Sequence, residues 1–381
     1  MKTGETMKTI WRWVPVLAAV TGVILVTSGP AGTAWAAARA ASGNGAAVIT
    51  RAAQQTVTDH MLSGDETSVS CLTASRCVAV GSQGLPSVPG SHGEVVTVTN
   101  GKQSHAVVLR RSSVIDSVSC WKSGCWAIGH PVHGTGAYLV KISSAGRPVA
   151  ERTVPMLART TLGPISCASV RSCEIAGADN RIRPQAIEIG DWNGKKLRLH
   201  RVTVKGSKRL SMTAISCWHS DCEAVGGAMV GPGFSESNRK GLILTTVGGK
   251  PARLNADSGY PYLPGVSCVS ATTCYGASGG YSVLTVTRGV VTHSQGGAGG
   301  ELSAIECTAS GCEAAGTVLL PQYSAQDGWL QSLSDGTWGV GIDDGAAVWF
   351  SGIAARGGSG GFIAIGIWAF NGLSDSDAAV G

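Results

Sequence analysis

The sequence predicts an all-β protein made of repeated units, on the basis of its composition, a recurring cysteine pair and a recurring turn. Charged residues make up only 14% of the 381 residues, whereas glycine alone contributes 54. Helical bundles and coiled coils are rich in Ala, Glu, Lys and Leu, so this composition disfavours them. A hydrophobic share of 43% also excludes a disordered chain, which combines low hydrophobicity with high charge. A β-rich globular protein remains.

Twelve cysteines occur as six close pairs. The first members of the pairs follow one another at intervals of 49, 47, 50, 51 and 39 residues. In each unit a short apolar segment leads into the first cysteine, a small polar turn follows, and the second cysteine opens another segment, as in SVSCLTASRCVAVG. A pattern that recurs six times at nearly one period is a structural repeat. The pairs are Cys71/Cys77, Cys120/Cys125, Cys167/Cys173, Cys217/Cys222, Cys268/Cys274 and Cys307/Cys312.

A second turn signal stands between the cysteine pairs. Each unit contains a dipeptide that ends in glycine, and such dipeptides favour the positive φ of tight hairpins. Two hairpins give four strands in about 47 residues, which is the size and content of one propeller blade. The chain is therefore predicted to fold as a β-propeller. The dipeptides are Asn100-Gly101, Ala145-Gly146, Asn193-Gly194, Gly248-Gly249, Arg288-Gly289 and Asp335-Gly336.

A seventh unit without cysteines follows the six pairs. FIAIG, which begins at Phe362, matches CVAVG of the first unit, and Arg356 stands where the spacing puts the first cysteine. Residues 46–51 (AAVITR) resemble the outgoing half of a hairpin and are predicted to close the ring. We expect seven blades, six stapled by disulfides and one free of cysteine. A six-bladed ring with a capping segment is the alternative.

The cysteine pairs are predicted to form disulfides within each unit. An even number of regularly placed cysteines indicates disulfides in an oxidising compartment, and both members of a pair flank one tight turn. Closing a loop of about six residues contributes roughly 2 kcal/mol on the chain-entropy account. Zinc is the alternative, but it takes four ligands, and one pair per blade leaves the pairs too far apart to share an ion.

Small residues occupy one face of the strand after each second cysteine. Ala79 and Ala224 stand two positions beyond it, and Gly81 and Gly226 stand four positions beyond it. Because alternate residues of a strand share a face, this face is nearly bare. We expect it to lie where the blades converge on the axis.

The first 36 residues have the pattern of a secretory signal peptide. Lys2, Lys8 and Arg12 form a basic start, an uncharged apolar run spans 14–26, and Ala34-Trp35-Ala36 supplies small residues for cleavage. An uncleaved membrane anchor is the alternative, although the run is short of the about 20 residues that a span needs.

These features divide the chain into a signal peptide (1–36) cleaved near Ala36, a linker (37–45) and one propeller domain (46–381). The weak positive charge left after cleavage does not indicate nucleic-acid binding. We expect a secreted, extracellular monomer with no membrane span, whose partner is an extracellular glycan or protein.

The repeat unit SxSCxSxxxCxAVG resembles that of secreted bacterial β-propeller-like proteins. More remotely, it is similar to sialidase-type (Asp-box) and photosystem-assembly-factor-type propellers. Residues 334–338 (SDGTW) come nearest to the Asp-box S-x-D-x-G-x-T-W, with a different spacing. The resemblance covers about residues 46–381 and implies the propeller fold. The sialidase arginine triad and Tyr/Glu pair match no residues of this sequence, so no catalytic residue carries over.

Positive charge is concentrated between residues 181 and 209, where nine basic residues face two acidic ones. In KKLRLHRV the basic residues alternate with leucines, which puts them on one strand face. One interpretation is a patch for an acidic polysaccharide or teichoic acid. The other is an outermost strand that carries charge to prevent edge-to-edge association. The candidate polyanion-binding residues are Lys195, Lys196, Arg198 and Arg201.

Trp121 and Trp218 occupy the same position after a first cysteine, inside a turn that is expected to be exposed. An exposed indole often stacks on a sugar or a protein partner. The alternative is a tryptophan folded back over its disulfide.

We predict a non-catalytic binding or scaffold propeller for an extracellular carbohydrate or protein ligand, with no cofactor and no metal. His130 and His133 lack an identifiable third metal ligand, and no nucleophile elbow precedes a helix. A sialidase-like hydrolase or lyase, with Arg, Tyr and Glu converging on a central channel, is the alternative. A structural envelope component is a third possibility.

Overall fold

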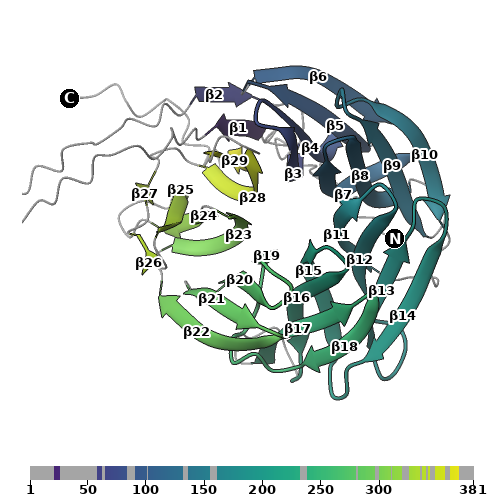
Figure 1. Cartoon of the computed structure of the whole chain (residues 1–381), viewed down its shortest axis with the longest axis vertical. Coiled ribbons are helices and arrows are strands. Elements are labelled where there is room, and N and C mark those ends of the chain that lie inside the picture. Colours follow the sequence, from purple (N-terminus) through teal and green to yellow (C-terminus); the bar gives the residue numbers. More distant parts are fainter. Residues whose placement is uncertain are drawn as a thin grey trace, which may run out of the picture.

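The computed structural model describes residues 21–25, 58–61, 65–83, 91–100, 102–131, 136–154, 161–231, 238–279, 282–296, 300–309, 311–319, 326–334, 337–339, 342–343, 348–356 and 361–368. These residues contain no α-helix, and their strands form seven antiparallel sheets. Figure 1 shows the sheets set as blades around a central opening, in chain order. The protein is a β-propeller, as predicted. In this part of the chain no helix is long and apolar enough to cross a membrane.

Each blade runs from an inner strand at the axis to an outer strand at the rim, and we number the blades I to VII in the order of their inner strands. The inner strands are β3 (Asp65–Thr73), β7 (Ser112–Trp121), β11 (Thr161–Ser169), β15 (Arg209–Trp218), β19 (Gly265–Cys268), β23 (Gly300–Thr308) and β28 (Val348–Arg356). The second strands are β4 (Arg76–Gln83), β8 (Gly124–Pro131), β12 (Ser172–Asp179), β16 (Asp221–Met229), β20 (Thr273–Ser278), β24 (Gly311–Leu319) and β29 (Gly361–Trp368).

The third strands are β5 (His92–Thr99), β9 (Ala137–Ser143), β13 (Ala186–Trp192), β17 (Arg239–Val247), β21 (Ser282–Thr287), β25 (Gln326–Ser334) and, in blade VII, β1 (Thr21–Leu25). The outer strands are β6 (Lys102–Leu109), β10 (Pro148–Val154), β14 (Leu197–Thr203), β18 (Lys250–Asn255), β22 (Val290–Gly296), the pair β26 (Thr337–Trp338) and β27 (Ile342–Asp343) in blade VI, and β2 (Thr58–Met61) in blade VII. Six complete four-stranded blades and one with a reduced outer edge therefore make up the described ring.

Blade VII joins the two ends of the chain. Its inner hairpin, β28 and β29, is C-terminal, and β1 and β2 add to it from the N-terminal side, with Gly22 paired to Gly366. The segment predicted to close the ring, residues 46–51, lies outside the described residues. β1 instead comes from the apolar run assigned to the signal peptide.

The cysteine-free blade corrects one sequence assignment. Ala355, not Arg356, pairs with Phe362, so Ala355 occupies the position of the first cysteine. Cys71 and Cys77 are six residues apart, whereas Ala355 and Phe362 are separated by one residue more. Alignment by spacing alone therefore placed the equivalent position one residue too late.

The glycine dipeptides form the outer hairpin turns, as predicted. Asn100 and Arg288 have φ of 48° and 50°, and Gly146 and Gly194 have φ of 80° and 83°. These values lie in the left-handed region that glycine and asparagine tolerate best. Asp335-Gly336 lies outside the described residues. Because successive strands alternate in direction, the cysteine turns and the glycine turns lie on one face of the ring, which we name the disulfide face. The remaining connections lie on the opposite, or loop, face.

Each cysteine pair forms a disulfide within its own blade, between directly paired positions of the inner and second strands. All twelve cysteines are used in this way, so no thiolate is left to bind zinc and the zinc alternative is not supported. The disulfides are Cys71–Cys77, Cys120–Cys125, Cys167–Cys173, Cys217–Cys222, Cys268–Cys274 and Cys307–Cys312.

The two cysteines of each disulfide differ in burial, which the sequence did not indicate. Every first cysteine is partly buried at the edge of the inner strand. Every second cysteine is buried, because the second strand lies inside its sheet, between the inner and third strands, and the cysteine packs into a hydrophobic cluster. The second cysteines are therefore core residues that no ligand reaches, and they are not part of a binding surface. Their exposed fractions are 3% for Cys77, 0% for Cys125, 1% for Cys173, 2% for Cys222, 3% for Cys274 and 3% for Cys312.

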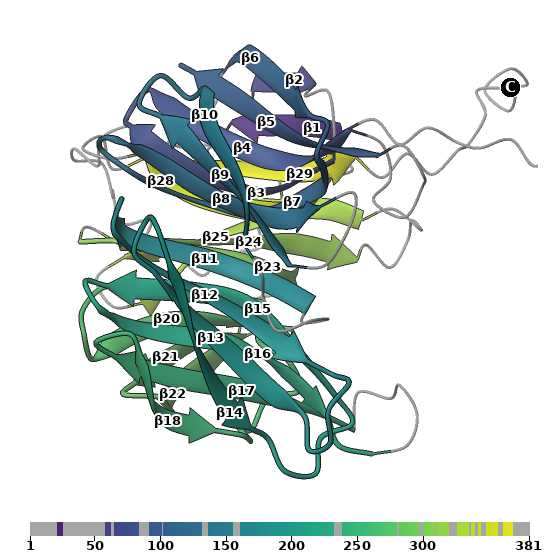
Figure 2. The ribbon, with the colours of Figure 1, turned by 90° about the vertical axis from the view of Figure 1, so that its right-hand side faces the viewer.

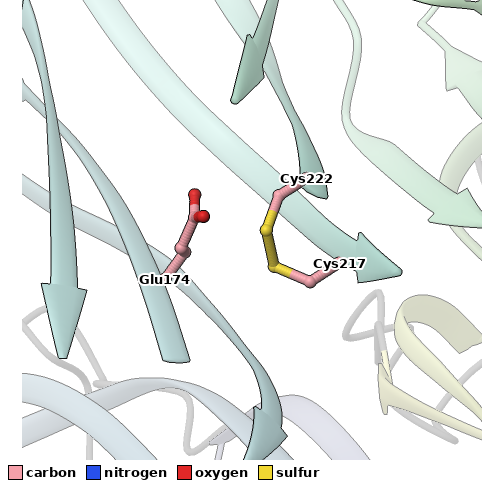
Figure 3. Close-up of side chains that lie close together, drawn as sticks. All are labelled: Glu174, Cys217 and Cys222. Atoms are coloured by element: carbon pink, nitrogen blue, oxygen red, sulfur yellow. A yellow bond between two sulfur atoms is a disulfide. The ribbon is translucent and has the colours of Figure 1, made fainter. Parts of the chain in front are cut away.

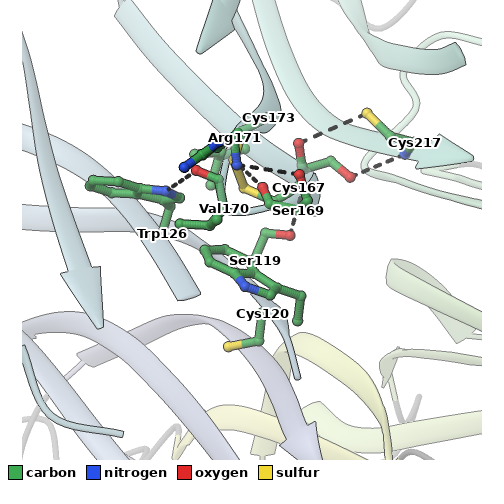
Figure 4. Close-up of a disulfide and its surroundings, with 12 residues drawn as sticks. Ser119, Cys120, Trp126, Cys167, Ser169, Val170, Arg171, Cys173 and Cys217 are labelled. Atoms are coloured by element: carbon green, nitrogen blue, oxygen red, sulfur yellow. Dashed lines mark hydrogen bonds between the residues drawn. A yellow bond between two sulfur atoms is a disulfide. The ribbon is translucent and has the colours of Figure 1, made fainter. Parts of the chain in front are cut away.

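A hydrogen bond links five of the six disulfide turns to the next blade. The serine before a first cysteine accepts this bond from the backbone N–H of the first cysteine in the following blade. The inner strand is an edge strand, and no further strand pairs with its free edge. The serine therefore satisfies a backbone N–H that would otherwise have no partner in the sheet. Figure 4 shows the bonds that the backbone N–H groups of Cys167 and Cys217 donate, to Ser119 and to the serine of the preceding blade respectively. The serine-to-cysteine contacts are Ser70–Cys120 (3.0 Å), Ser119–Cys167 (2.8 Å), Ser166–Cys217 (3.1 Å), Ser216–Cys268 (2.9 Å) and Ser267–Cys307 (2.9 Å).

The glycines of the small strand face have a cause that the sequence did not indicate. A Cβ on Gly226 would lie 2.0 Å from the carbonyl oxygen of Ser211, on the inner strand of the same blade. A Cβ added to Gly129 would lie 2.0 Å from the carbonyl oxygen of Val114, and one added to Gly316 would lie 1.9 Å from that of Glu301. The glycines are required because the backbone of the paired inner strand, next to its β-bulge, occupies the space that a Cβ would need.

The hydrophobic core lies between neighbouring blades. Ile187 and Ile189 of β13 share one buried cluster with Leu242 and Leu244 of β17. In the side view of Figure 2, blades III and IV lie next to each other. Full burial of such a side chain contributes about 1.5–3 kcal/mol, so the contacts between blades hold the ring together.

Candidate functional site

The basic segment predicted to bind polyanions is divided between two environments. Lys195 and Lys196 lie in the exposed β13–β14 turn, and Arg198 is exposed on β14. Arg201, in contrast, donates a hydrogen bond to the buried carboxylate of Glu188 at 2.8 Å and also pairs with Asp179 at 3.3 Å. Arg201 therefore neutralises charge inside blade III, whereas the other three side chains are available to a ligand.

Lys195 lines a groove of about 480 Å³ between blades II and III on the disulfide face. Lys141 of β9, Arg152 of β10 and Arg171 of the β11–β12 turn also line it. Within the described residues none of these four cations pairs with a carboxylate, and Glu151 is the one acidic residue lining the groove. The hydroxyl of Tyr138 donates a hydrogen bond to Glu151. The groove therefore carries a clear excess of positive charge.

Packing beneath the groove holds Arg152 in place. The ring of Trp192 lies 5.9 Å from the guanidinium carbon of Arg152, and Nη1 of Arg152 donates to the carbonyl oxygen of Lys195 at 2.8 Å. Trp126 packs edge-on against Trp192 with ring centroids 5.4 Å apart, and its indole N–H donates to the carbonyl oxygen of Val170 (Figure 4). These contacts connect both blades at the base of the groove.

Sequence reasoning missed Lys141, Arg152 and Arg171. They stand in three segments outside the run of charge, and Lys141 and Arg152 belong to the preceding blade. The repeat offers one signal: Arg171 lies in the cysteine turn of the same unit as Lys195, and both turns lie on the same face of the ring.

The two candidate stacking tryptophans differ in their surroundings. Trp121 is partly buried against the cluster of blades II and III, and its indole N–H donates to Ser123. Trp218 is 42% exposed and contacts the ring of His219 edge-on. Trp218 therefore offers an indole face to a ligand, whereas Trp121 covers its own hairpin.

A central channel of about 340 Å³ is lined by the seven inner strands. In most of these strands a β-bulge falls four residues before the first cysteine position. Bulge hydroxyls join the blades: Thr67 donates to the carbonyl oxygen of Ile115 at 3.0 Å, and Thr213 donates to that of Leu263 at 2.6 Å. The residues at this position are Thr67, Asp116, Gly163, Thr213, Pro264, Ser303 and Ser351.

Asp116 is the one ionisable residue in the described lining of this channel. Its carboxylate lies 3.4 Å from Nε2 of His130. Burial raises the pKa of Asp116 to about 7 and lowers the pKa of His130. Both effects favour the neutral forms of the pair. His133, the other histidine singled out in the sequence, lies outside the described residues.

A hollow of about 350 Å³ between blades IV and V opens on the loop face. Arg209 and Arg239 lie on either side of Met229 on adjacent strands, and Tyr262 forms part of the wall. Burial raises the pKa of Tyr262. The sequence analysis did not predict this hollow, because its residues come from three separate strands and one connection.

Glu174, Cys217 and Cys222 form the one described group of three residues whose ligand atoms are close enough to share a metal ion. Figure 3 shows the carboxylate of Glu174 beside the two sulfur atoms. The sulfurs are joined in a disulfide, and metals bind the thiolate form of cysteine. The oxidised protein therefore does not offer a thiolate metal site here.

No protein-family model and no curated protein sequence matches this chain. Among solved structures, it is similar to the WD40 β-propeller domain of Doa1, with a TM-score of 0.54 and 10% sequence identity over 80% of this chain and 93% of that domain. It is also similar to YCF48 bound to D1 peptide, with a TM-score of 0.49 and 12% identity over the same shares of the two chains. Likeness at such low identity shows the fold alone, and that fold is the β-propeller.

Proposed function

We propose that this chain is an exported, non-catalytic β-propeller that binds an anionic extracellular glycan in the groove between blades II and III. The observation that carries this proposal is the set of four cations around the groove: Lys141, Arg152, Arg171 and Lys195. Unpaired cations gathered in one concave site attract a polyanion and lower the cost of bringing its charges close together.

The chemistry of the groove suits carboxylate or sulfate groups on a sugar. Arg152 is already fixed by Trp192 and by the carbonyl oxygen of Lys195, so little side-chain entropy is lost when it binds. Its planar guanidinium matches the two oxygens of an acidic group. Ala150 and Val170 provide apolar wall for the carbon skeleton of a sugar ring.

The channel composition favours binding over the alternative of a sialidase-like hydrolase. That activity was expected to require Arg, Tyr and Glu converging on the channel, and the described lining contains none of these three residue types. It consists of Ser, Thr, Gly, Ala, Pro and aliphatic residues around Asp116.

Removing two groove charges tests the binding proposal. We expect the double variant Lys195→Gln/Arg171→Gln to bind polygalacturonate and dextran sulfate at least about tenfold more weakly than the wild type, because charge and hydrogen-bond donors are lost from the site. Titration calorimetry at fixed salt measures the affinity. Neutral dextran serves as the uncharged probe, and mass spectrometry of the supernatant detects any cleavage product.

The matched control is Lys205→Gln/Lys208→Gln, which removes the same charge from the exposed connection on the loop face. We expect this variant to keep wild-type affinity. Equal losses in both double variants would mean that net charge, and not the groove, attracts the polymer. Release of a product would favour the hydrolase, and binding only to proteins would replace the glycan by a protein ligand.

Export makes a separate prediction about the N-terminus. We expect protein recovered from outside the producing cell to begin at Ala37, because small residues at Ala34 and Ala36 follow the apolar run. Intact-mass analysis and N-terminal sequencing measure this. A mature chain that retains Thr21–Leu25, the strand β1 of the full-length chain, would contradict cleavage near Ala36.

A further inference from the structure

One of the six disulfides has a carboxyl group directly against it. The residue after the second cysteine is glutamate in blades III, IV and VI (Glu174, Glu223 and Glu313) and apolar or aromatic in the others. Glu174 of β12 reaches the next blade, where a carboxylate oxygen and the sulfurs of Cys217 and Cys222 all lie within 4.8 Å of one another (Figure 3). Among the described residues this arrangement occurs once.

Glu174 is held in place but not fully satisfied. Its side chain is 5% exposed, and Oε2 accepts a hydrogen bond from the Thr246 hydroxyl at 2.8 Å. Oε1 is buried and has no hydrogen-bond partner in the described part of the chain. The pKa of Glu174 is raised to about 7, mainly by burial: the Thr246 bond lowers it, and the charges of Asp191 and Asp221 add to the rise. Both protonation states are therefore accessible near neutral pH.

The two sulfurs differ in their access to solvent. Cys222 is 2% exposed, whereas Cys217 is only partly buried and precedes the exposed Trp218. An external thiolate therefore reaches Cys217, and the leaving sulfur is that of Cys222. A thiolate left in a buried site is costly unless it is protonated. The carboxyl group of Glu174 is placed to supply that proton.

We propose that Cys217–Cys222 is a thiol–disulfide exchange site for a dithiol reductant, with Glu174 as proton donor to Cys222 during reduction and proton acceptor during oxidation. The reductant thiolate bonds to Sγ of Cys217, the Cys217–Cys222 bond breaks, and its electron pair stays on Cys222, which takes the proton of Glu174. The second thiolate of the reductant then attacks the mixed disulfide, and Cys217 leaves and is protonated from solvent. Glu174 then takes a proton from solvent, so that overall the dithiol loses two electrons and two protons and the protein disulfide gains them.

The test measures the reduction rate of each disulfide in the folded exported protein. Dithiothreitol is the probe, N-ethylmaleimide stops the reaction, and peptide mass spectrometry counts the alkylated cysteines between pH 5.5 and 8.5. The matched disulfide is Cys268–Cys274, which has one partly buried and one buried cysteine but no carboxyl group at this distance. We expect Cys217–Cys222 to be reduced about tenfold faster than Cys268–Cys274 at pH 6.

Substitution of the carboxyl group gives the mechanism-specific signature. For Cys217–Cys222, the ratio of the wild-type rate to the Glu174→Gln rate is expected to exceed 1 at pH 5.5 and to fall to 1 or below at pH 8.5, where Glu174 is ionised. Thr246→Val removes the bond that lowers the pKa of Glu174, so it should move this fall to higher pH. Glu223 follows Cys222 in the chain, but its carboxylate is bonded to Thr245. The ratio of the wild-type rate to the Glu223→Gln rate should therefore stay at 1 over the whole pH range. A ratio for Glu174→Gln that does not change with pH, or reduction of Cys217–Cys222 no faster than that of Cys268–Cys274, overturns the proposal.

Discussion

The Gly226→Ala variant is expected to unfold at least about 5 °C below the wild type, a loss of about 3 kcal/mol or more. The added methyl carbon would lie 2.0 Å from the carbonyl oxygen of Ser211 and 3.0 Å from Cα of Met212. Both are backbone atoms of the inner strand, so relief of the overlap requires the paired strands β15 and β16 to separate. Differential scanning calorimetry measures the change.

Gly296→Ala is the matched control, because nothing lies within 4 Å of a Cβ built at Gly296 and its φ is ordinary. This variant is expected to unfold within about 1 °C of the wild type. If Gly226→Ala were as stable as Gly296→Ala, the close approach of the inner-strand backbone to Gly226 would not exist in solution.

The folded protein is expected to be more stable at pH 5 than at pH 8.5. Burial raises the pKa of five carboxyl groups from ordinary values near 4 to about 7, namely Asp116, Glu174, Glu223, Glu306 and Glu313. Because the folded state holds these protons more tightly than the unfolded state, their stabilisation is complete below the unfolded pKa and is lost as pH rises through about 7. We expect the melting temperature to fall by about 5 °C or more between pH 5 and pH 8.5.

A glutamine substitution separates this effect from the remaining titrations. Glu313 is buried and accepts a hydrogen bond from Ser332 at 3.0 Å, which a glutamine oxygen also accepts. The Glu313→Gln variant should therefore lose less stability between pH 5 and pH 8.5 than the wild type. Glu301→Gln, at an exposed position, should follow the wild-type profile. Stability that rises with pH would contradict the burial of these groups as neutral acids.

Features that depend on short segments could be predicted from the sequence. A disulfide across one turn and a hairpin at Asn193-Gly194 require only neighbouring residues, and their repetition identifies a blade. The burial of the second cysteine, as at Cys125, was not visible, because it depends on the blade that packs against it. The serine before five of the six first cysteines was visible in the repeated motif, but its role was not. Its hydrogen bond runs to the next blade, as from Cys217 to Ser166, and depends on how two blades pack.

Features that depend on several blades could not be predicted. The groove combines Lys141 and Arg152 of one blade with Arg171 and Lys195 of the next, and no spacing in the sequence relates these positions. The charge pattern included Arg201, whose partner Glu188 lies on the adjacent strand of its own blade. A run of like charge therefore indicated the region of the site, and the fold decided which side chains remain available to a ligand.

Hydrogen–deuterium exchange with and without dextran sulfate tests the location of the site most directly. The proposed function predicts slower exchange on binding in the peptides that carry Lys141, residues 150–152, residues 170–171 and residues 193–195, with little change around Arg209 and Arg239. Protection confined to the hollow at Arg209 and Arg239, or to the central channel at Asp116, would contradict the groove between blades II and III as the ligand site.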